Sequence, residues 1–496
     1  MSNDPVAQHD EDSSAHLDVN ALKQLPADIQ RPRYPLDTID IGVAHLGPGA
    51  FHRAHQAWFF DDALNHDTRW GVSAISLKTA SLRDALAPQN GLYTVAVLDA
   101  TIRDRVIGAL RETLVASEDR QRALARLSAA QTRIVTLTIT EKGYCLDADG
   151  QLDFSHPDIR ADLAAPHAPS SSIGYLVAAL RQRRERGIKP FSVISCDNLS
   201  DNGGKLGRAV VALAGARDSD LARWIEAEVA FPRSMVDSIV PATDAALRER
   251  VAAALGVEDR WPVQREAFAQ WVIEDRFCND VPDWTAIGVN ITRDVAAFER
   301  AKLRLLNGAH STLAYLGLLA GHETVLQAMD DTALAIFVEN LMREDISPTV
   351  SVPADFDLDG YIGSVLARFR NRAMSHALAQ IAWDGSQKLP FRLLATIRDA
   401  LIENRSIKRL CVPIAAWLHF IRRALAAQRV LVDPLAEMLN AAARRCDGSG
   451  THDVVEFLDI GKIFGEDLPR DPRFVAALVR AYDRLATLSI DEALRR

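Results

Sequence analysis

The chain has 496 residues, of which 48% are hydrophobic and 25% charged, and its formal net charge is −9. This composition indicates a globular protein of two or three domains. No lysine- and arginine-rich block is present to follow a phosphate backbone, and no apolar run is long enough to cross a membrane, so we expect neither a nucleic-acid nor a membrane partner.

The five cysteines are scattered along the chain and show no Cys-x2-Cys spacing. This pattern predicts neither a disulfide framework nor a zinc site, so we expect no metal, and it fits the reducing cytoplasm. The first residues are polar and contain no apolar core of a signal peptide. We therefore expect a cytoplasmic protein whose residues 1–35 form a flexible N-terminal arm.

In the first half, short apolar runs alternate with amphipathic stretches. The runs predict strands, and the stretches between or after them predict helices. This alternation is typical of an α/β fold with a parallel, doubly wound sheet, which we assign to residues 36–289. The expected strands are 39–47, 70–77, 92–99, 133–140 and 190–198, and the expected helices are 54–65, 119–130, 171–186 and 203–228.

The first expected strand runs into a glycine-containing loop. Gly47 and Gly49 form a Gly-x-Gly where the strand meets its helix, which favours a dinucleotide-binding loop. The third glycine of the usual fingerprint is replaced by His52. We expect Phe51, His52 and Arg53 near the nucleotide; the alternative for the two charged residues is a polar helix start.

The second expected strand ends without an acidic residue. In NAD-binding sheets an aspartate or glutamate at this point usually binds the ribose hydroxyls. Here the strand is followed by Lys78, which either faces a 2′-phosphate or is solvated. The residues alone therefore leave the choice between NAD and NADP open.

Beyond about residue 290 the sequence has helical periodicity and almost no strand signal. We therefore expect a mainly α-helical C-terminal domain over 290–496 that binds the substrate. Its expected helices are 333–345, 358–382, 391–402, 407–427, 434–445 and 472–487.

Three polar residues interrupt an apolar helical stretch at the start of this second part. Lys302, Asn307 and His310 occur within a run that otherwise predicts a buried helix. With α-helical geometry they lie at roughly 0°, 140° and 80° around the axis, next to Leu303 and Leu306. A lysine in such an apolar wall has a lowered pKa and can exchange protons near neutral pH, which indicates a catalytic cluster.

Six motifs in order are similar to those of the mannitol dehydrogenase family, a family of polyol-specific dehydrogenases. The resemblance extends from about residue 38 to 485 and implies a Rossmann-type domain, a helical C-terminal domain and metal-independent hydride transfer with NAD, NADP being possible. The motifs are Gly-Pro-Gly-Ala-Phe-His-Arg-Ala-His-Gln, Thr-Glu-Lys-Gly-Tyr, Ser-Cys-Asp-Asn-Leu, Met-Val-Asp, Lys-x4-Asn-x2-His and Asp-Gly-Ser-Gln-Lys-Leu-Pro.

The resemblance also implies roles for individual residues. The catalytic lysine of the family falls on Lys302, and its oxyanion-stabilising asparagines fall on Asn198 and Asn307. The histidine that contacts the substrate falls on His310. Two further substrate-side positions fall on Asp237 and Lys388.

Within the family, Lys142, Gln380 and Gln387 resemble the fructuronate reductase branch, whose members interconvert D-mannonate and D-fructuronate. The carboxylate of such a substrate needs a cation, for which Lys142 and Lys388 are candidates. The alternatives are a mannitol 2-dehydrogenase, a zinc-dependent polyol dehydrogenase and a non-catalytic nucleotide-binding protein. The sequence does not indicate an oligomeric state.

Overall fold

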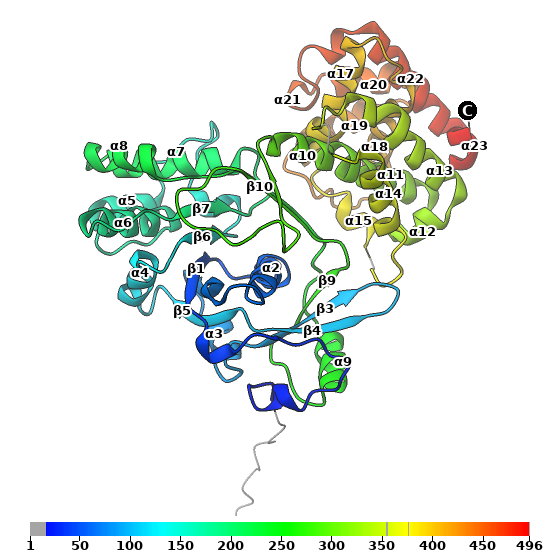
Figure 1. Ribbon diagram of the computed structural model, residues 1–496. Helices are drawn as coiled ribbons and strands as arrows, with labels where there is room; N and C mark the ends of the chain where they lie inside the picture. Colours follow the sequence, from blue (N-terminus) through cyan, green and yellow to red (C-terminus); the bar gives the residue numbers. More distant parts are fainter. Residues whose placement is uncertain (1–15, 354–355, 375, 496) are drawn as a thin grey trace, which may run out of the picture. The chain divides into compact units, whose positions relative to one another are not determined.

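The computed structural model of the chain describes residues 16–353, 356–374 and 376–495. It contains two compact units, of which the first ends at Val295 and the second begins at Ala296 (Figure 1). Each unit has its own fold and is described by itself.

The first unit is built on a five-stranded sheet in the order β5-β2-β1-β6-β7, and all its neighbouring strands are parallel. The predicted doubly wound sheet is therefore confirmed. The chain order reverses between β1 and β6, which is where such sheets bind ligands. The strands are β1 Ile41–Leu46, β2 Gly71–Ser76, β5 Leu110–Val115, β6 Ile134–Leu137 and β7 Ser192–Ser195.

Both faces of this sheet are buried, because side chains alternate between two hydrophobic cores. Val43 contributes to one core and its neighbour Ala44 to the other. Figure 1 shows α4, α6 and α7 on one side of the sheet and α2 on the other. The helices of this unit are α1 Ala50–Ala54, α2 Gln56–Ala63, α3 Ser81–Leu86, α4 Arg120–Ser128, α5 Pro157–Ala164, α6 Ser172–Glu185, α7 Asn202–Gly215, α8 Ser219–Glu228 and α9 Ala245–Leu255, and α10 Val295–Ala301 leads into the second unit.

The strand predicted over 92–99 forms, but it belongs to a different sheet. It is β3, which pairs with β4 in an antiparallel and with β9 in a parallel arrangement. The edge of the five-stranded sheet is β5, which the apolar pattern did not reveal because it contains Arg111 and Glu112. A third sheet has the order β11-β10-β8. The strands of the two smaller sheets are β3 Tyr93–Leu98, β4 Arg103–Ile107, β8 Ser234–Asp237, β9 Val263–Glu266, β10 Gln270–Glu274 and β11 Asn290–Thr292.

The expectation of a flexible arm over 1–35 is wrong for residues 16–35. Leu17 and Leu22 are buried in a small core with Leu247 and Val251 of α9. The arm also joins the sheet of β4, since the backbone N–H of Val106 donates to the carbonyl of Gln30 at 2.8 Å. Apolar residues spaced among polar ones thus anchor this segment. Residues 1–15 lie outside the described part of the chain.

The second unit is helical, as predicted. Its described residues form helices and one isolated bridge between Thr324 and Ala377. The predicted helix over 358–382 is interrupted, because α14 ends at Phe369 and α15 begins only at Leu378. The α-helices are α11 Gly308–Ala320, α12 Val325–Asp330, α13 Thr332–Asn340, α14 Leu358–Phe369, α15 Leu378–Ile381, α16 Gly385–Leu389, α17 Ala395–Ile402, α18 Lys408–Ala426, α19 Ala436–Arg445, α20 Gly450–Leu458, α21 Gly461–Phe464, α22 Pro472–Thr487 and α23 Ile490–Arg495.

Three further helical segments of this unit are π-helices rather than α-helices. They are η5 Lys302–Asn307, η6 Leu341–Ile346 and η8 Pro390–Leu394. Both η6 and η8 contact η5.

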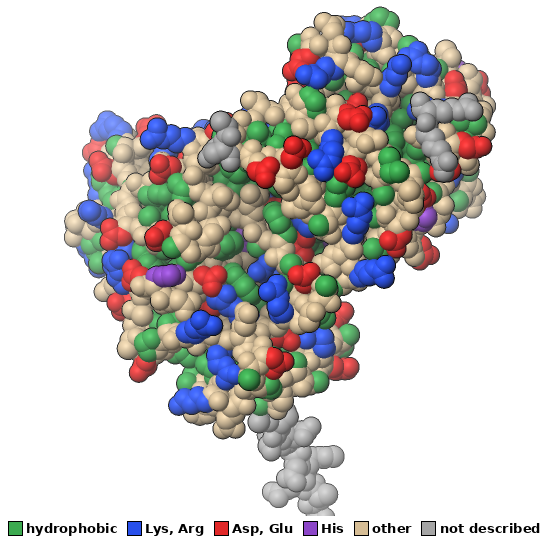
Figure 2. All heavy atoms as spheres, turned by 45° about the vertical axis from the view of Figure 1, so that its right-hand side comes forward, with side chains coloured by type: hydrophobic (Ala, Val, Ile, Leu, Met, Phe, Trp, Pro, Cys, Tyr) green, Lys and Arg blue, Asp and Glu red, His purple; other side chains and the backbone are tan. Residues whose placement is uncertain are grey.

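None of the described helices of the chain is long and apolar enough to cross a membrane. On the face drawn in Figure 2, basic and acidic side chains are interspersed.

Candidate active site

The carboxyl ends of β1, β2 and β6 open onto a cleft of about 770 Å³. The size is that of an ordinary ligand pocket, and the position is the one that doubly wound sheets use for dinucleotides. The residues that follow the three strands and line the cleft are 47–50 after β1, 77–79 after β2, and 138–140 with 142–143 after β6.

The two glycines of the predicted nucleotide loop have different structural roles. Gly47 has a φ of 86°, and a Cβ there would lie 2.3 Å from the carbonyl oxygen of Thr138, so no other residue fits between the ends of β1 and β6. A Cβ on Gly49 would meet nothing nearer than the Gly47 oxygen, at 4.0 Å. Gly49 therefore faces open space, where a phosphate can approach the backbone closely. These features fit a dinucleotide.

His52, at the position of the missing third glycine, is fully buried and stacks on His45 of β1 with ring centroids 3.4 Å apart. His45 is held by hydrogen bonds to the hydroxyls of Thr136, at 2.7 Å, and Thr138, at 2.9 Å. Burial lowers the pKa of His45 to about 3 and that of His52 well below its usual value, so both rings are neutral. The stack joins α1 to β1, a packing role that the third glycine usually has. A direct contact of His52 with the cofactor stays a prediction.

Arg53 brings a positive charge to the cleft, which it lines together with Trp261. Its guanidinium donates to the Trp261 carbonyl at 2.7 Å and lies 5.0 Å from the centre of the indole ring. Burial lowers the pKa of Arg53 to about 10, which leaves it charged at neutral pH. Phe51 is half-buried, stacks on His55 at 5.0 Å and is not among the residues that line the cleft.

Lys78 lines the cleft at the end of β2, as predicted for a nucleotide contact, and its side chain is 77% exposed. The ammonium lies 3.8 Å from a carboxylate oxygen of Asp158, which lines the same cleft from α5. Asp158 is far from Lys78 in the chain and belongs to no recognised motif, so the sequence alone does not mark it.

Two of the predicted polar motifs are joined by one carboxylate. Asp197 accepts hydrogen bonds from the backbone N–H groups of Ile139, at 3.0 Å, and Thr140, at 2.9 Å, and from the Tyr144 hydroxyl, at 2.7 Å. Thr140 has a φ of 63°, which is strained for a residue with a side chain. Asp197 stabilises this turn, so it fixes the loop after β6 relative to the end of β7.

The remaining predicted residues of the first unit lie at strand ends. Asn198 follows Asp197 at the carboxyl end of β7 and is exposed. Lys142 is exposed in η4 Glu141–Tyr144 and lines the cleft, so it can face a cofactor phosphate as well as a substrate. Asp237 is the last residue of β8 and is only 4% exposed.

In the second unit, Lys302 and Asn307 are the first and last residues of the π-helix η5, so the predicted α-helical arrangement of the cluster is wrong. The backbone N–H of Gly308 donates to the carbonyl of Leu303, five residues earlier. The wider turn reduces the angle between residues five apart, which an α-helix would separate by about 140°. Lys302, Leu303, Asn307 and His310 are all half-buried.

Two arginines hold this π-helix in place. Arg304, within η5, donates to the Thr349 carbonyl at 2.8 Å and to the carboxylate of Asp399 at 2.5 Å. Arg392, from the π-helix η8, donates to the carbonyl of Asn307 at 3.4 Å and to the hydroxyl of Ser311 at 2.9 Å. Only the fold brings η8 against η5, so the sequence alone does not mark Arg392.

The ring of His310 is set between other rings. It stacks against Phe369 with centroids 5.5 Å apart and lies 5.8 Å from His376. Its Nε2 has no hydrogen-bond partner among the described residues. A buried ring nitrogen without a partner is costly unless a ligand supplies one, so this atom is available to a substrate hydroxyl.

The electrostatic surroundings of His310 are positive. Burial lowers its pKa well below the usual value, and His376, Arg392, Arg368 and Lys388 lower it further. The ring is therefore neutral at neutral pH. The positive charges of Arg392, Arg368 and Lys388 favour a negatively charged group beside the ring.

Lys388 lies in α16, where its ammonium donates to the Ile381 carbonyl at 3.3 Å. Burial and Arg392 lower its pKa. Gln380, in α15, is exposed. Asp384 immediately precedes this short helix, and a Cβ on Gly385 would lie 2.4 Å from the Trp417 indole nitrogen.

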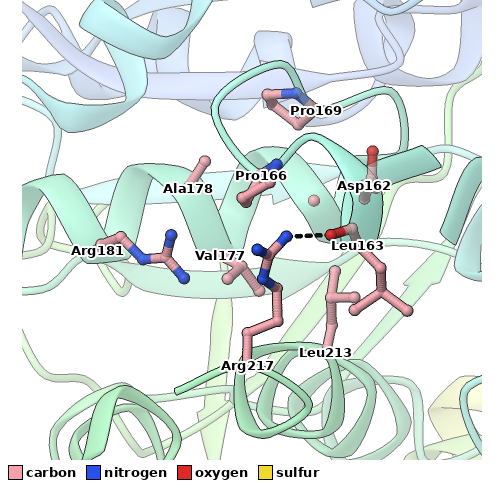
Figure 3. Close-up of a pocket in the computed structure, with 10 residues that line it drawn as sticks. Asp162, Leu163, Pro166, Pro169, Val177, Ala178, Arg181, Leu213 and Arg217 are labelled. Carbon is pink, nitrogen blue, oxygen red and sulfur yellow. Dashed lines mark hydrogen bonds between the residues drawn. The ribbon is translucent and has the colours of Figure 1, made fainter. Parts of the chain in front are cut away.

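Two other features are not candidate sites. A cavity of about 20 Å³ in the first unit has room for little more than one water molecule, and Arg217 extends across it to the carbonyl of Leu163 (Figure 3). One possible ligand atom from each of Asp447, His452 and Asp453 lies within 4.8 Å of the others. However, the Asp453 carboxylate already accepts from the Tyr482 hydroxyl at 2.6 Å.

Comparison with known proteins agrees with this geometry. Residues 41–286 match the mannitol dehydrogenase Rossmann domain, and residues 294–486 match the mannitol dehydrogenase C-terminal domain. The chain belongs to the mannitol dehydrogenase family. It is thus an oxidoreductase, and the predicted family is confirmed.

The relatives of the chain include a D-mannonate oxidoreductase and mannitol 2-dehydrogenases. The D-mannonate oxidoreductase of Escherichia coli K12 is 42% identical over 467 residues, which cover 92% of this chain and 96% of that protein. The mannitol 2-dehydrogenase of Aspergillus fumigatus Af293 is 37% identical over 487 residues, which cover 96% of this chain and 95% of that protein.

Solved structures of similar proteins share the whole fold. D-sorbitol dehydrogenase in its substrate-free form is 32% identical with a TM-score of 0.89, and the match covers 96% of this chain and 100% of that chain. A ternary complex of Pseudomonas fluorescens mannitol 2-dehydrogenase with NAD and D-mannitol is 36% identical with a TM-score of 0.80, covering 97% and 99%.

Proposed function

We propose that this mannitol dehydrogenase-family enzyme transfers hydride between NAD and a sugar acid, interconverting D-mannonate and D-fructuronate. The family membership supports a polyol or sugar-acid dehydrogenase, and the D-mannonate oxidoreductase similarity supports the acid. The NAD complex of the Pseudomonas fluorescens relative supports the cofactor.

The observation that carries the choice of a sugar acid is the positive environment of His310. Arg392, Arg368 and Lys388 all act on this ring. A hexuronate has a carboxylate that a hexitol lacks, and burying it unpaired costs several kcal/mol. Asp384 and Asp433 offset part of the charge of Lys388, whereas the side chains that lower the pKa of His310 are all basic.

The cleft of the first unit holds the cofactor in this proposal. Gly47 and Gly49 let the pyrophosphate approach the backbone, while Arg53 and Lys142 supply positive charge. Bound NAD supplies the acceptor for the hydride in the oxidative direction.

The chain's own residues handle the proton and the developing charge. Lys302 in its neutral form takes the proton from the hydroxyl that is oxidised, and returns it in the reductive direction. The side-chain amides of Asn198 and Asn307 donate to that oxygen as negative charge develops, each contributing about 2.7–4 kcal/mol at typical sites of this kind. The neutral ring of His310 binds the neighbouring hydroxyl through Nε2.

The substrate assignment is tested by comparing D-fructuronate with D-fructose. We expect kcat/KM for D-fructuronate to be at least about tenfold higher, because a paired carboxylate adds about 1.4 kcal/mol of transition-state preference. Lys388→Met should erase most of this preference and leave fructose reduction nearly unchanged. Lys142→Met is the matched variant in the other unit: if it erases the preference instead, Lys142 binds the carboxylate.

The second candidate is a mannitol 2-dehydrogenase, favoured by the 37% identity to the fungal enzyme and by the similarity to the mannitol complex. Equal or better activity on D-fructose in the unmodified enzyme would favour this candidate. Absence of nicotinamide turnover with every ketose and keto-uronate would instead indicate a non-catalytic nucleotide-binding protein. Activity that survives exhaustive EDTA treatment would exclude a zinc enzyme.

A further inference from the structure

Among the described residues that line the cleft of the first unit, the carboxylate of Asp158 lies close to a lysine that follows β2. The end of this strand is where doubly wound sheets usually bind a dinucleotide ribose. β2 ends at Ser76 and is followed by Leu77 and Lys78, without the acidic residue that usually binds the ribose hydroxyls of NAD. The carboxylate of Asp158, on α5, lies 3.8 Å from the Lys78 ammonium.

The geometry leaves both groups able to bind a ligand. Their separation is longer than a hydrogen bond, and the side chains of Lys78 and Asp158 are 77% and 36% exposed. An ion pair of this kind contributes little, so a ligand can displace it. The start of α5 is fixed, because His156 accepts from the backbone N–H of Asp158 at 3.2 Å and Pro157 occupies the first helical turn.

Both residues line the same cleft as the Gly47–Gly49 loop. The ribose next to the pyrophosphate therefore comes within reach of either side chain. A carboxylate accepts hydrogen bonds from the two ribose hydroxyls of NAD. The 2′-phosphate of NADP adds negative charge instead, which Asp158 repels and Lys78 attracts.

We propose that Asp158 takes the place of the missing acid at the end of β2, binds the adenosine ribose of NAD, and discriminates against the 2′-phosphate of NADP. Its negative charge also offsets part of the attraction between Lys78 and a 2′-phosphate. This inference rests on the proposed function, since it requires a dinucleotide in the cleft.

The test measures equilibrium binding of NADH and NADPH by fluorescence titration and, in parallel, kcat/KM with both cofactors. The unmodified protein should bind NADH at least about tenfold more tightly than NADPH. Asp158→Asn should tighten NADPH binding until the two affinities agree within about threefold, because the lysine then faces the phosphate without a competing carboxylate. Asp149→Asn, an exposed acid that does not line the cleft, is the matched control and should change neither affinity.

A double variant separates the effect of the Asp158 carboxylate from that of the Lys78 ammonium. Adding Lys78→Ala to Asp158→Asn should weaken NADPH binding again by at least about fivefold, and Lys78→Ala alone should not improve it. An NADPH-to-NADH ratio that Asp158→Asn leaves within twofold of the original would overturn the inference while the proposed function stands. If the unmodified protein binds neither nucleotide, the proposed function and this inference both fall.

Discussion

Lys302 is the side chain on which the proposed proton transfer depends, and it lies at the first position of a π-helix rather than within an α-helix. π-Helical turns are rare and often occur at functional sites, so this position supports a catalytic role. Lys302 is half-buried, as are Leu303 and Asn307 in the same π-helix.

Replacing Lys302 with alanine should therefore lower kcat by at least about 10²-fold, the lower range for loss of a positioned base. NADH affinity should change little, because the nucleotide cleft is lined by the first unit. Steady-state kinetics and a fluorescence titration measure the two effects, and Lys408→Ala, a surface variant of α18, is the control. Near-normal kcat in Lys302→Ala would remove the lysine from the mechanism.

The buried histidine stack predicts a pH dependence of stability. The pKa of His45 is lowered to about 3, and that of His52 is lowered too, so between pH 3 and pH 6.5 the unfolded chain binds protons that the folded chain excludes. Stability is then fully present above about pH 6.5 and falls as the pH decreases, on the order of 1 kcal/mol per pH unit for each such histidine.

Urea unfolding between about pH 7 and about pH 5 tests this dependence, since most carboxylates remain ionised over that range. His45→Asn should flatten the slope, whereas His66→Gln should not, because His66 is exposed. An unchanged slope in His45→Asn would show that the stack does not govern the acid sensitivity.

At the scale of elements, sequence periodicity located the helix of Lys302 but not its type. The run 302–320 is compatible with either an α-helix or a π-helix at its start, because it is so largely apolar that its pattern does not resolve a single wider turn. The π turn depends on contacts from elsewhere: Arg304 with Thr349 and Asp399, and Arg392 with Asn307 and Ser311. Such tertiary bonds leave no trace in local periodicity.

Arg392 should therefore position Asn307 as well as stabilise the fold. Arg392→Met removes two hydrogen bonds from a charged donor, which should lower the free energy of unfolding by about 1–3 kcal/mol. It should also lower kcat, because the carbonyl that orients the end of η5 loses its partner. Arg398→Met, on α17, breaks a pair with Asp467 and should leave kcat unchanged. A stability loss with normal kcat would limit Arg392 to a structural role.

At the scale of the whole molecule, the sequence predicted an α/β unit and a helical unit, because apolar residues follow a different pattern in strands and in helices. Strands of the parallel sheet are apolar on both faces, and the long helices α18 and α22 repeat their apolar residues with a helical period. Sheet order did not follow from these periods, so β3 was found but its separate sheet was not. The edge strand β5 was missed because Glu112 is polar and is satisfied by Arg126 at 2.6 Å, a contact made only in the fold.

The residues of the candidate site also divide into those that a local sequence pattern marks and those that only the fold brings together. Gly47, Lys302 and His310 belong to local motifs, so the sequence alone marks them as candidates. Asp158 and Arg392 act across elements that are distant in the chain, and no local pattern marks them. The arm over residues 16–35 is a further case, because its few leucines anchor it only once α9 is present.

The π-helix η5 also has a consequence for how such a site can change by insertion or deletion. A π turn is one residue longer than the α turn it replaces. Deleting Leu303 would allow the backbone to close as a regular α-helix, so the segment would lose its wide turn without losing its helix. Lys302 and Asn307 would then be four residues apart and separated by about 40° round the axis, so they would stay on one face of the helix. Closing the present spacing of five residues as an α-helix would instead separate them by about 140°. The π turn thus lets a spacing of five residues keep these two side chains on one face.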